Sequence, residues 1–264
     1  MITLNSLSKI YRTDEIETVA LENVNLTVER GEFLSIMGPS GCGKSTLLNI
    51  MGLLDAPTMG IVEINGIRTE GMKDKELAIF RNKTLGFVFQ SFHLINSLNV
   101  TDNVELPLLY RRVGSSERKR LAQEVLEKVG LSHRMRHFPT QLSGGQCQRV
   151  AIARAIIGNP EIILADEPTG NVDPEMSHDI IQLLSEINDM GTTVLVVTHE
   201  HELVRQFNKR VIVIDHGRVK SDTKNPEAAL AYDAQYEDID EIIEGIALNK
   251  ETKENFVDND VVPD

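Results

Sequence analysis

The stretch that decides the fold reads Gly38-Pro39-Ser40-Gly41-Cys42-Gly43-Lys44-Ser45-Thr46, and it fits the phosphate-binding pattern G-x-x-x-x-G-K-[ST]. Its glycines let backbone N–H groups wrap an anion without a Cβ in the way. Lys44 brings a positive charge to the outer phosphates, and Ser45 offers a hydroxyl to Mg²⁺. The stretch predicts a nucleoside triphosphate site if a strand enters the loop and a helix leaves it.

The flanking residues meet that condition. Residues 32–37 are apolar enough for a buried strand, and residues 46–54 have the pattern of a helix. Further apolar runs predict buried strands at residues 86–90, 162–165, 194–197 and 211–214. A helix is expected at 174–188, and apolar strands that alternate with helices favour a parallel sheet covered on both faces.

Two other parts of the chain have a different pattern. Near the N-terminus, residues 2–7 and 21–28 alternate apolar and polar side chains, and residues 61–64 form a further strand before the turn residues Asn65-Gly66. Residues 92–160 are expected to be mainly helical, with helices at 117–129 and 145–157. This helical stretch is expected to be an insertion into the sheet domain.

Two carboxylates, Asp166 and Glu167, follow the predicted strand at 162–165. Open α/β sheets bind ligands at the carboxyl ends of their strands, which places Asp166 beside the phosphate loop. A carboxylate there suits the shell of Mg²⁺, and a second one near the terminal phosphate can accept a proton from attacking water. The alternative is that the pair only ends a turn.

A second anion site is expected at Leu142-Ser143-Gly144-Gly145-Gln146, which opens a helix. Ser143 suits the helix N-cap, and Gly144 and Gly145 leave backbone N–H groups uncovered. A simple helix cap is the alternative interpretation. Because one chain carries two such helix starts, we expect each chain to supply half of a shared site. Two copies would meet head to tail, with ATP between the phosphate loop of one and Ser143 of the other.

Together these motifs resemble the ATP-binding cassette (ABC) ATPases, over about residues 1–222. The resemblance implies a P-loop NTPase (RecA-like) α/β core, an N-terminal antiparallel β subdomain and an inserted α-helical subdomain at about 92–160. It implies ATP and Mg²⁺ as cofactors and ATP hydrolysis as the activity. In that family's pattern, Tyr11 matches the aromatic residue that stacks on adenine, and Gln90 matches the glutamine that senses Mg²⁺ and the γ-phosphate. Asp173 matches the loop that crosses the dimer interface, and His199 matches the histidine that contacts the γ-phosphate. A strand-end aromatic and a structural histidine are the alternatives for the first and last.

Several segments are similar to the LolD/MacB branch of that family, which includes lipoprotein-release and macrolide or peptide export systems; they are Tyr11-Arg12 and residues 86–92, 103–108 and 164–171. The resemblance implies a separate integral-membrane permease as partner, with a docking surface near Gln90 and residues 91–112. Apolar side chains that could line it are Phe92, Leu94, Leu98, Leu106, Leu108 and Leu109, unless they form the helical core instead. A non-transport ATPase of the cell-division FtsE type is the alternative.

Composition limits the remaining options. No run of 18 apolar residues and no secretory signal is visible, so we expect a cytoplasmic protein held at the inner face of the membrane by its permease. No basic surface points to nucleic acid, because the net charge is −13 and residues 226–264 hold twelve acidic side chains against two lysines. The acidic extension 223–264 is expected to be partly disordered, with one amphipathic helix on Ile239, Ile242, Ile243 and Ile246. It could dock on the chain's own body, bind a partner or stay unfolded.

Overall fold

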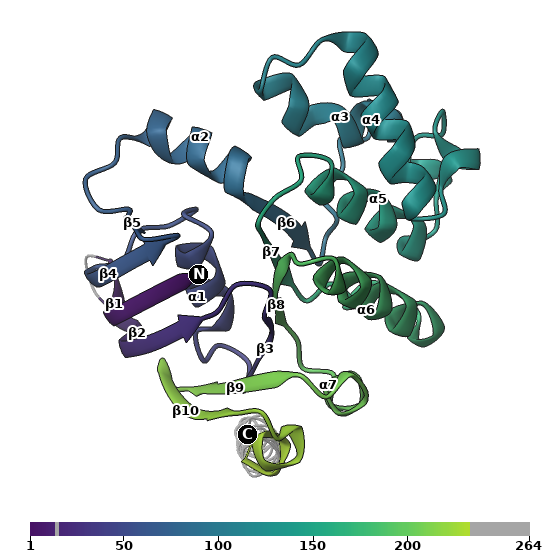
Figure 1. The fold of residues 1–264 in the computed structure, drawn as a ribbon. Helices are drawn as coiled ribbons and strands as arrows, with labels where there is room; N and C mark the ends of the chain where they lie inside the picture. The colour runs from purple at the N-terminus through teal and green to yellow at the C-terminus, as the bar shows by residue number, and fades with distance from the viewer. Residues whose placement is uncertain (14–15, 233–264) are drawn as a thin grey trace, which may run out of the picture.

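Two β-sheets organise the protein, whose computed structural model describes residues 1–13 and 16–232 (Figure 1). The first sheet is antiparallel, with the spatial order β2 (Glu17–Val28), β1 (Ile2–Arg12), β4 (Met59–Ile64) and β5 (Ile67–Arg68). The second has the order β10 (Arg218–Thr223), β9 (Arg210–Asp215), β3 (Phe33–Met37), β8 (Thr193–Val197), β7 (Ile162–Asp166) and β6 (Leu85–Phe89). Its neighbouring strands are parallel except for the β9–β10 pair.

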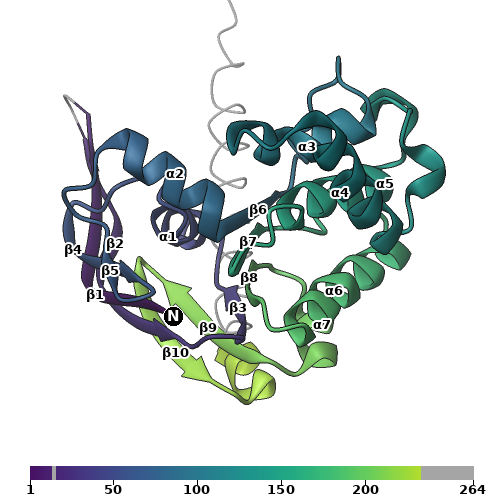
Figure 2. The same ribbon diagram turned by 45° about the horizontal axis from the view of Figure 1, so that its top comes forward.

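Helices cover both faces of the six-stranded sheet, as the apolar strands require. In β8, Val194 and Val196 join one core cluster while Leu195 and Val197 join another, because side chains alternate along a strand. Helix α1 (Lys44–Met51) fills the space between the two sheets. On the opposite face lie α6 (Pro174–Asp189) and the helical part of the chain (Figures 1 and 2).

The helical part lies beyond the β6 edge of the sheet (Figure 2). Its elements are α3 (Val100–Tyr110), α4 (Ser115–Lys128), the 3₁₀ turns Ser132–Arg134 and Pro139–Gln141, and α5 (Gly144–Ile156). These helices share a continuous apolar core with α6 and with one face of the sheet. Helix α5 therefore packs on the face opposite to α1.

The last described residues pack on the body of the protein. Residues 226–232 are helical, and Ala229 and Leu230 are buried against Val204 of α7 (His201–Phe207) and two valines of β9. Arg205 of α7 also pairs with Glu227 at 3.4 Å. The amphipathic helix expected at the four isoleucines from Ile239 to Ile246 lies outside the described residues.

The expected α/β class, the parallel sheet, the antiparallel N-terminal strands and the inserted helices are all confirmed. The helix after the phosphate loop begins earlier than expected, at Lys44, and ends at Met51, because Leu53 adopts a left-handed backbone conformation with φ 55°. Four elements were not predicted from the sequence: β5, α2 (Asp74–Thr84), α7 and β10. Among residues 1–13 and 16–232, no helix has the length and apolarity needed to cross a bilayer.

Candidate functional site

The phosphate loop joins β3 to α1 and can form only with glycine at two positions. Gly38 has φ 135°, and a Cβ there would lie 1.9 Å from the carbonyl oxygen of Ile214. Gly43 has φ 110°, and a Cβ there would lie 2.4 Å from the oxygen of Ala20. Gly43 is also the N-cap of α1, with no side-chain hydrogen bond to the first turn. The backbone N–H groups at this helix start are thus left for a ligand.

Lys44 is buried, and its ammonium is held over the loop. Its Nζ donates to the carbonyl oxygens of Gly38 at 2.6 Å and Pro39 at 2.7 Å, and lies 3.9 Å from the Sγ of Cys42. Carbonyl oxygens satisfy the hydrogen bonds of an ammonium but not its charge. A triphosphate would supply that charge, which makes this lysine suited to bind the outer phosphates.

Ser45 and Asp166 form an oxygen pair at the end of β7. The Ser45 hydroxyl donates to Asp166 Oδ1 at 3.1 Å. Burial raises the pKa of the Asp166 carboxyl, and Glu167 adds to the rise, while Ser45 and Lys44 oppose it. Hydroxyl and carboxylate oxygens are the hard ligands that Mg²⁺ prefers, and this cation usually keeps several waters. The two residues would therefore suit a magnesium ion, which would neutralise part of the charge of a bound triphosphate.

Glu167 and His199 meet across the ends of β7 and β8. His199 Nδ1 lies 3.5 Å from Glu167 Oε1, and the two side chains are 61% and 27% exposed in that order. Glu167 has φ 45°, and its N–H donates to the oxygen of Val197 at 2.9 Å. A non-glycine residue in this region is uncommon, and here it turns the glutamate away from the direction of the strand. A carboxylate and an imidazole thus stand next to the Ser45–Asp166 pair.

Gln90 follows β6 and packs on the segment after Glu167. A Cβ on Gly170 would lie 2.6 Å from Gln90 Nε2, so a larger residue there would displace the Gln90 side chain. The amide of Asn171 donates to the backbone oxygen of Gln90 at 2.9 Å. The sequence analysis did not single out Asn171, although it lies between the predicted Glu167 and Asp173.

The helix start at Ser143 differs from the phosphate loop in its hydrogen bonds, and it belongs to α5 in the helical part of the chain. Ser143 Oγ accepts from the N–H of Gln146 at 3.3 Å, and the Gln146 side chain accepts from the N–H of Ser143 at 3.1 Å. Gly144 packs on Asn171, because a Cβ there would lie 2.6 Å from its oxygen. Among the described residues, no hydrogen bond or ion pair joins residues 143–146 to the phosphate loop. Within one chain, the structure therefore does not bring these two predicted phosphate sites together.

Two other predicted site residues have clear structural partners. Asp173 caps α6, because its Oδ1 accepts from the N–H of Met176 at 3.1 Å. Tyr11 is 44% exposed at the end of β1 and donates its hydroxyl hydrogen to Asp55 Oδ2 at 2.9 Å. Lys9 Nζ lies 4.8 Å from the centre of the Tyr11 ring. Lys9 and Asp55 were not predicted from the sequence; only the spacing of Lys9 to Tyr11 on one strand could have suggested Lys9.

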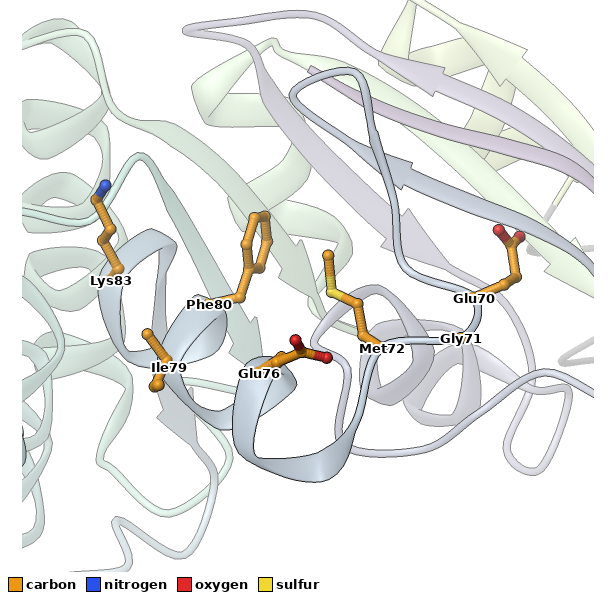
Figure 3. A pocket seen from close by; sticks show the side chains of 7 residues that line it. All are labelled: Glu70, Gly71, Met72, Glu76, Ile79, Phe80 and Lys83. Atoms are coloured by element: carbon orange, nitrogen blue, oxygen red, sulfur yellow. The ribbon is translucent and has the colours of Figure 1, made fainter.

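Two hollows lie away from the phosphate loop. A groove of about 1140 Å³ runs between α2, β6, α3 and α5, and it includes Leu106, Tyr110 and Arg154. A smaller pocket of about 480 Å³ lies beside α2 (Figure 3), where Met72, Ile79 and Phe80 supply apolar side chains. Of the six side chains expected to form a docking surface, only Leu106 lines the groove, and Leu108 is instead buried in the helical core.

A glycine-rich loop between strand β3 and helix α1, with a carboxylate pair at the end of β7 in the same sheet, defines a P-loop ATPase. The sequence pattern of the family described as "ABC transporter" matches residues 21–170. The chain therefore belongs to the ABC transporter ATPase family.

Its relatives include several ATP-binding subunits. An uncharacterized ABC transporter ATP-binding protein of Methanocaldococcus jannaschii, MJ1508, is 52% identical over 81% of this chain and 96% of its own length. The macrolide export ATP-binding/permease protein MacB of Bdellovibrio bacteriovorus is 47% identical over 85% of this chain but 34% of its own length. The solved structure of the cassette MJ0796, a dimer in a post-hydrolysis state bound to ADP and Pi, has a TM-score of 0.79 and 47% identity, with 84% of this chain and 98% of that chain covered.

Proposed function

We propose that this chain is the ATP-hydrolysing subunit of a transporter, and that two copies close head to tail around two ATP molecules. The observation that carries the proposal is the separation of its two phosphate-type helix starts. Helices α1 and α5 pack on opposite faces of one sheet, which argues against both helix starts closing on the same nucleotide within one chain. A second copy in head-to-tail orientation would supply the missing half. The dimeric form of the MJ0796 cassette supports this arrangement.

Within each shared site we assign roles by chemistry. Residues 38–46 would wrap the phosphates, Lys44 would neutralise them, and Ser45 and Asp166 would hold Mg²⁺. In the partner copy, residues 143–146 would close on the γ-phosphate from the opposite side. Asp173, as the cap of α6, would fix the loop that crosses between the copies.

Glu167 is the residue best placed to act as general base. Its carboxylate stands beyond Asp166 and can accept a proton from a water molecule that attacks the γ-phosphate. His199, 3.5 Å away, would orient this carboxylate and contact the phosphate. Gln90, tied to residues 170 and 171, would report the state of the site to the helical part of the chain.

The groove between α2 and α3 is the surface we assign to a separate membrane permease. Its lining includes six cations and no carboxylate: Lys75, Arg81, Lys83, Arg111, Arg112 and Arg154. The guanidinium groups of Arg111 and Arg154 are bound by the carbonyl oxygens of Gly158 and Phe92, and burial lowers the pKa of both. These cations have no ion pair with a described carboxylate, so a permease segment with acidic and apolar side chains would fit here.

The relatives narrow the kind of transport. The MacB proteins carry the name of macrolide export, and this chain matches about the ATP-binding third of their length. We infer export or extrusion of a lipoprotein, macrolide or peptide-like cargo, with this subunit on the cytoplasmic face of the membrane. Groove residues on this chain would meet the permease, and the cargo would be recognised by the permease.

A trapped complex tests the proposal. A Glu167→Gln variant should bind MgATP, stay dimeric and retain its membrane partner, because the proton acceptor is lost and the binding groups remain. Capture of this variant with MgATP from detergent-solubilised native membranes should yield a permease, and a matched Glu186→Gln variant on the exposed end of α6 should not enrich it. Co-purification of cell-division proteins and wall hydrolases would contradict the transport proposal in favour of the FtsE-type function, and no membrane partner would contradict both.

A further inference from the structure

Two side chains, Lys9 and Asp55, contact the side chain of Tyr11, the residue on whose ring we propose that adenine stacks. Asp55 accepts hydrogen bonds on both carboxylate oxygens, from Lys9 Nζ at 2.6 Å and from the hydroxyl of Tyr11 at 2.9 Å. Lys9 also donates to the oxygen of Ala56 at 2.8 Å. The Lys9 side chain is 12% exposed and the Asp55 side chain 31%, so the ion pair is partly shielded from water.

The ammonium of Lys9 also contacts the ring itself. It lies 4.8 Å from the centre of the Tyr11 ring, within the range of a cation–π contact. Since one face of the ring meets the ammonium, a base can stack only on the other face. The aromatic side chain is thereby fixed in two ways, through its hydroxyl and through its π-face.

Asp55 belongs to the segment that leaves α1. The N–H groups of Leu54 and Asp55 donate to the oxygen of Asn49 in the last turn of α1, at 2.9 and 3.3 Å. Thr58 continues the connection, because its N–H donates to Ser8 and its hydroxyl accepts from the N–H of Ile10 at 3.0 Å. The end of β1 is therefore attached to the same short helix whose first turn forms the phosphate loop.

We propose that Lys9 and Asp55 are positioning residues that hold the Tyr11 ring at a fixed distance from the phosphate loop. The inference rests on the proposed stacking of adenine on Tyr11. A ring that is already oriented loses less conformational entropy when a base stacks on it. The pair thus acts on the base of the nucleotide and leaves the triphosphate contacts unchanged.

The binding of two ligands, MgATP and magnesium tripolyphosphate, separates an effect on the base from an effect on the phosphates. The affinity of MgATP reports the base and the phosphates, and magnesium tripolyphosphate reports the phosphates alone. Tyr11→Phe keeps the ring and removes its hydrogen bond to Asp55, and Asp55→Ala removes the carboxylate that accepts from both Lys9 and Tyr11. Each should weaken MgATP by about three- to tenfold and leave tripolyphosphate binding unchanged. Asp55→Asn, which keeps an acceptor oxygen, should lie between Asp55→Ala and the unmodified chain.

Two controls distinguish failure of this inference from failure of the proposed adenine site. Tyr11→Ala should weaken MgATP more than any other variant, and an unchanged affinity would overturn the adenine assignment itself. If Tyr11→Ala weakens MgATP while Tyr11→Phe and Asp55→Ala bind like the unmodified chain, only the positioning role is wrong. Asp189→Ala, at the exposed last residue of α6, controls for the loss of a negative charge. Tripolyphosphate binding verifies that each variant is folded, and Tyr11→Phe remains decisive if Asp55→Ala does not fold.

Discussion

The starts of α1 and α5 are both predicted to bind phosphate, yet they are built in opposite ways. Helix α1 begins after Gly43 in a left-handed conformation, with no side chain on its first N–H groups and Lys44 beside them. Helix α5 begins after Ser143, which exchanges hydrogen bonds with Gln146 in a capping box. The first start is open and depends on a ligand, and the second is satisfied by its own side chains.

This difference suggests a division of labour. An uncapped helix start with a buried cation can bind nucleotide in a single chain, because its donors have no competing partner. We expect the capped start of α5 to bind weakly alone and to add its hydroxyl and remaining N–H groups only when a second copy presents a phosphate to it. Binding should therefore depend on α1, whereas closure and hydrolysis should depend on both.

The largest expected effect separates ATP binding from ATP hydrolysis in the half of the site that contains the start of α1. Glu167→Gln should lower ATP hydrolysis by about a thousandfold, because a general base contributes roughly two to four orders of magnitude. MgATP affinity should stay within about twofold of the unmodified chain, since the carboxamide is the same size. Turnover and equilibrium binding measured on the same preparation check this. Hydrolysis that survives in Glu167→Gln would transfer the role of base to another residue.

The second-largest expected effect tests whether Ser143 acts in ATP hydrolysis as well as capping α5. Aspartate caps helices as well as serine, so Ser143→Asp should leave the melting temperature unchanged. It should still lower hydrolysis by about a hundredfold, because a carboxylate would face the partner's γ-phosphate. Ser143→Ala should instead cost about 1 kcal/mol of stability and impair hydrolysis less. Full activity in Ser143→Asp would reduce this helix start to a structural cap.

A smaller effect compares the two cysteines, one at each helix start. Both thiols are buried, and burial raises the pKa of Cys147, which makes its thiolate scarce. Alkylation of Cys42 within the phosphate loop should weaken ATP binding by about tenfold, because the adduct would crowd the glycine backbone. MgATP should protect against the reagent, and Cys42→Ala should bind ATP normally and resist inactivation. Cys147→Ala serves as the matched control, and unchanged ATP binding after complete Cys42 modification would contradict this prediction.

The smallest effect concerns the contribution to stability of Asp166, the carboxylate that we propose would hold Mg²⁺. Because burial raises the pKa of Asp166 above its unfolded value, its ionisation opposes folding at neutral pH, and this penalty disappears as the pH falls through the folded pKa. Asp166→Asn should therefore raise the melting temperature by a few degrees at pH 7 and have no such effect near pH 3. Calorimetry of nucleotide-free protein at both values checks the sign. A lower melting temperature at pH 7 would mean that the Ser45 hydrogen bond outweighs burial.

The sequence predicted most of the parallel sheet and the residues at its carboxyl edge, because apolar runs and glycine loops are local signals. It missed α2, whose apolar residues 77–80 are consecutive and show no helical spacing. It also predicted a docking surface near Gln90 and residues 91–112, and the groove that we propose for this role takes a further wall from α2. Because α2 was not predicted, its part of the groove could not be predicted either.

Long-range contacts at the site were the least predictable. Asp55 meets Tyr11 across 44 residues, and Gly170 meets Gln90 by a close packing that depends on two separate strands. Neither pairing leaves a local pattern. For Asp173, by contrast, a local pattern was present. The resemblance placed this residue in a loop that crosses the dimer interface, but an aspartate directly before Pro174 also fits the N-cap of a helix.

The central claim is that each nucleotide site combines the α1 start of one copy with the α5 start of another. The most direct test mixes two variants in the Glu167→Gln background, one with Lys44→Ala and one with Ser143→Asp, and measures ATP retained by the dimer. Head-to-tail pairing places both defects in one site and leaves the other intact, so the mixture should retain ATP although neither variant does alone. A mixture that retains no more ATP than its separate components would contradict the shared site.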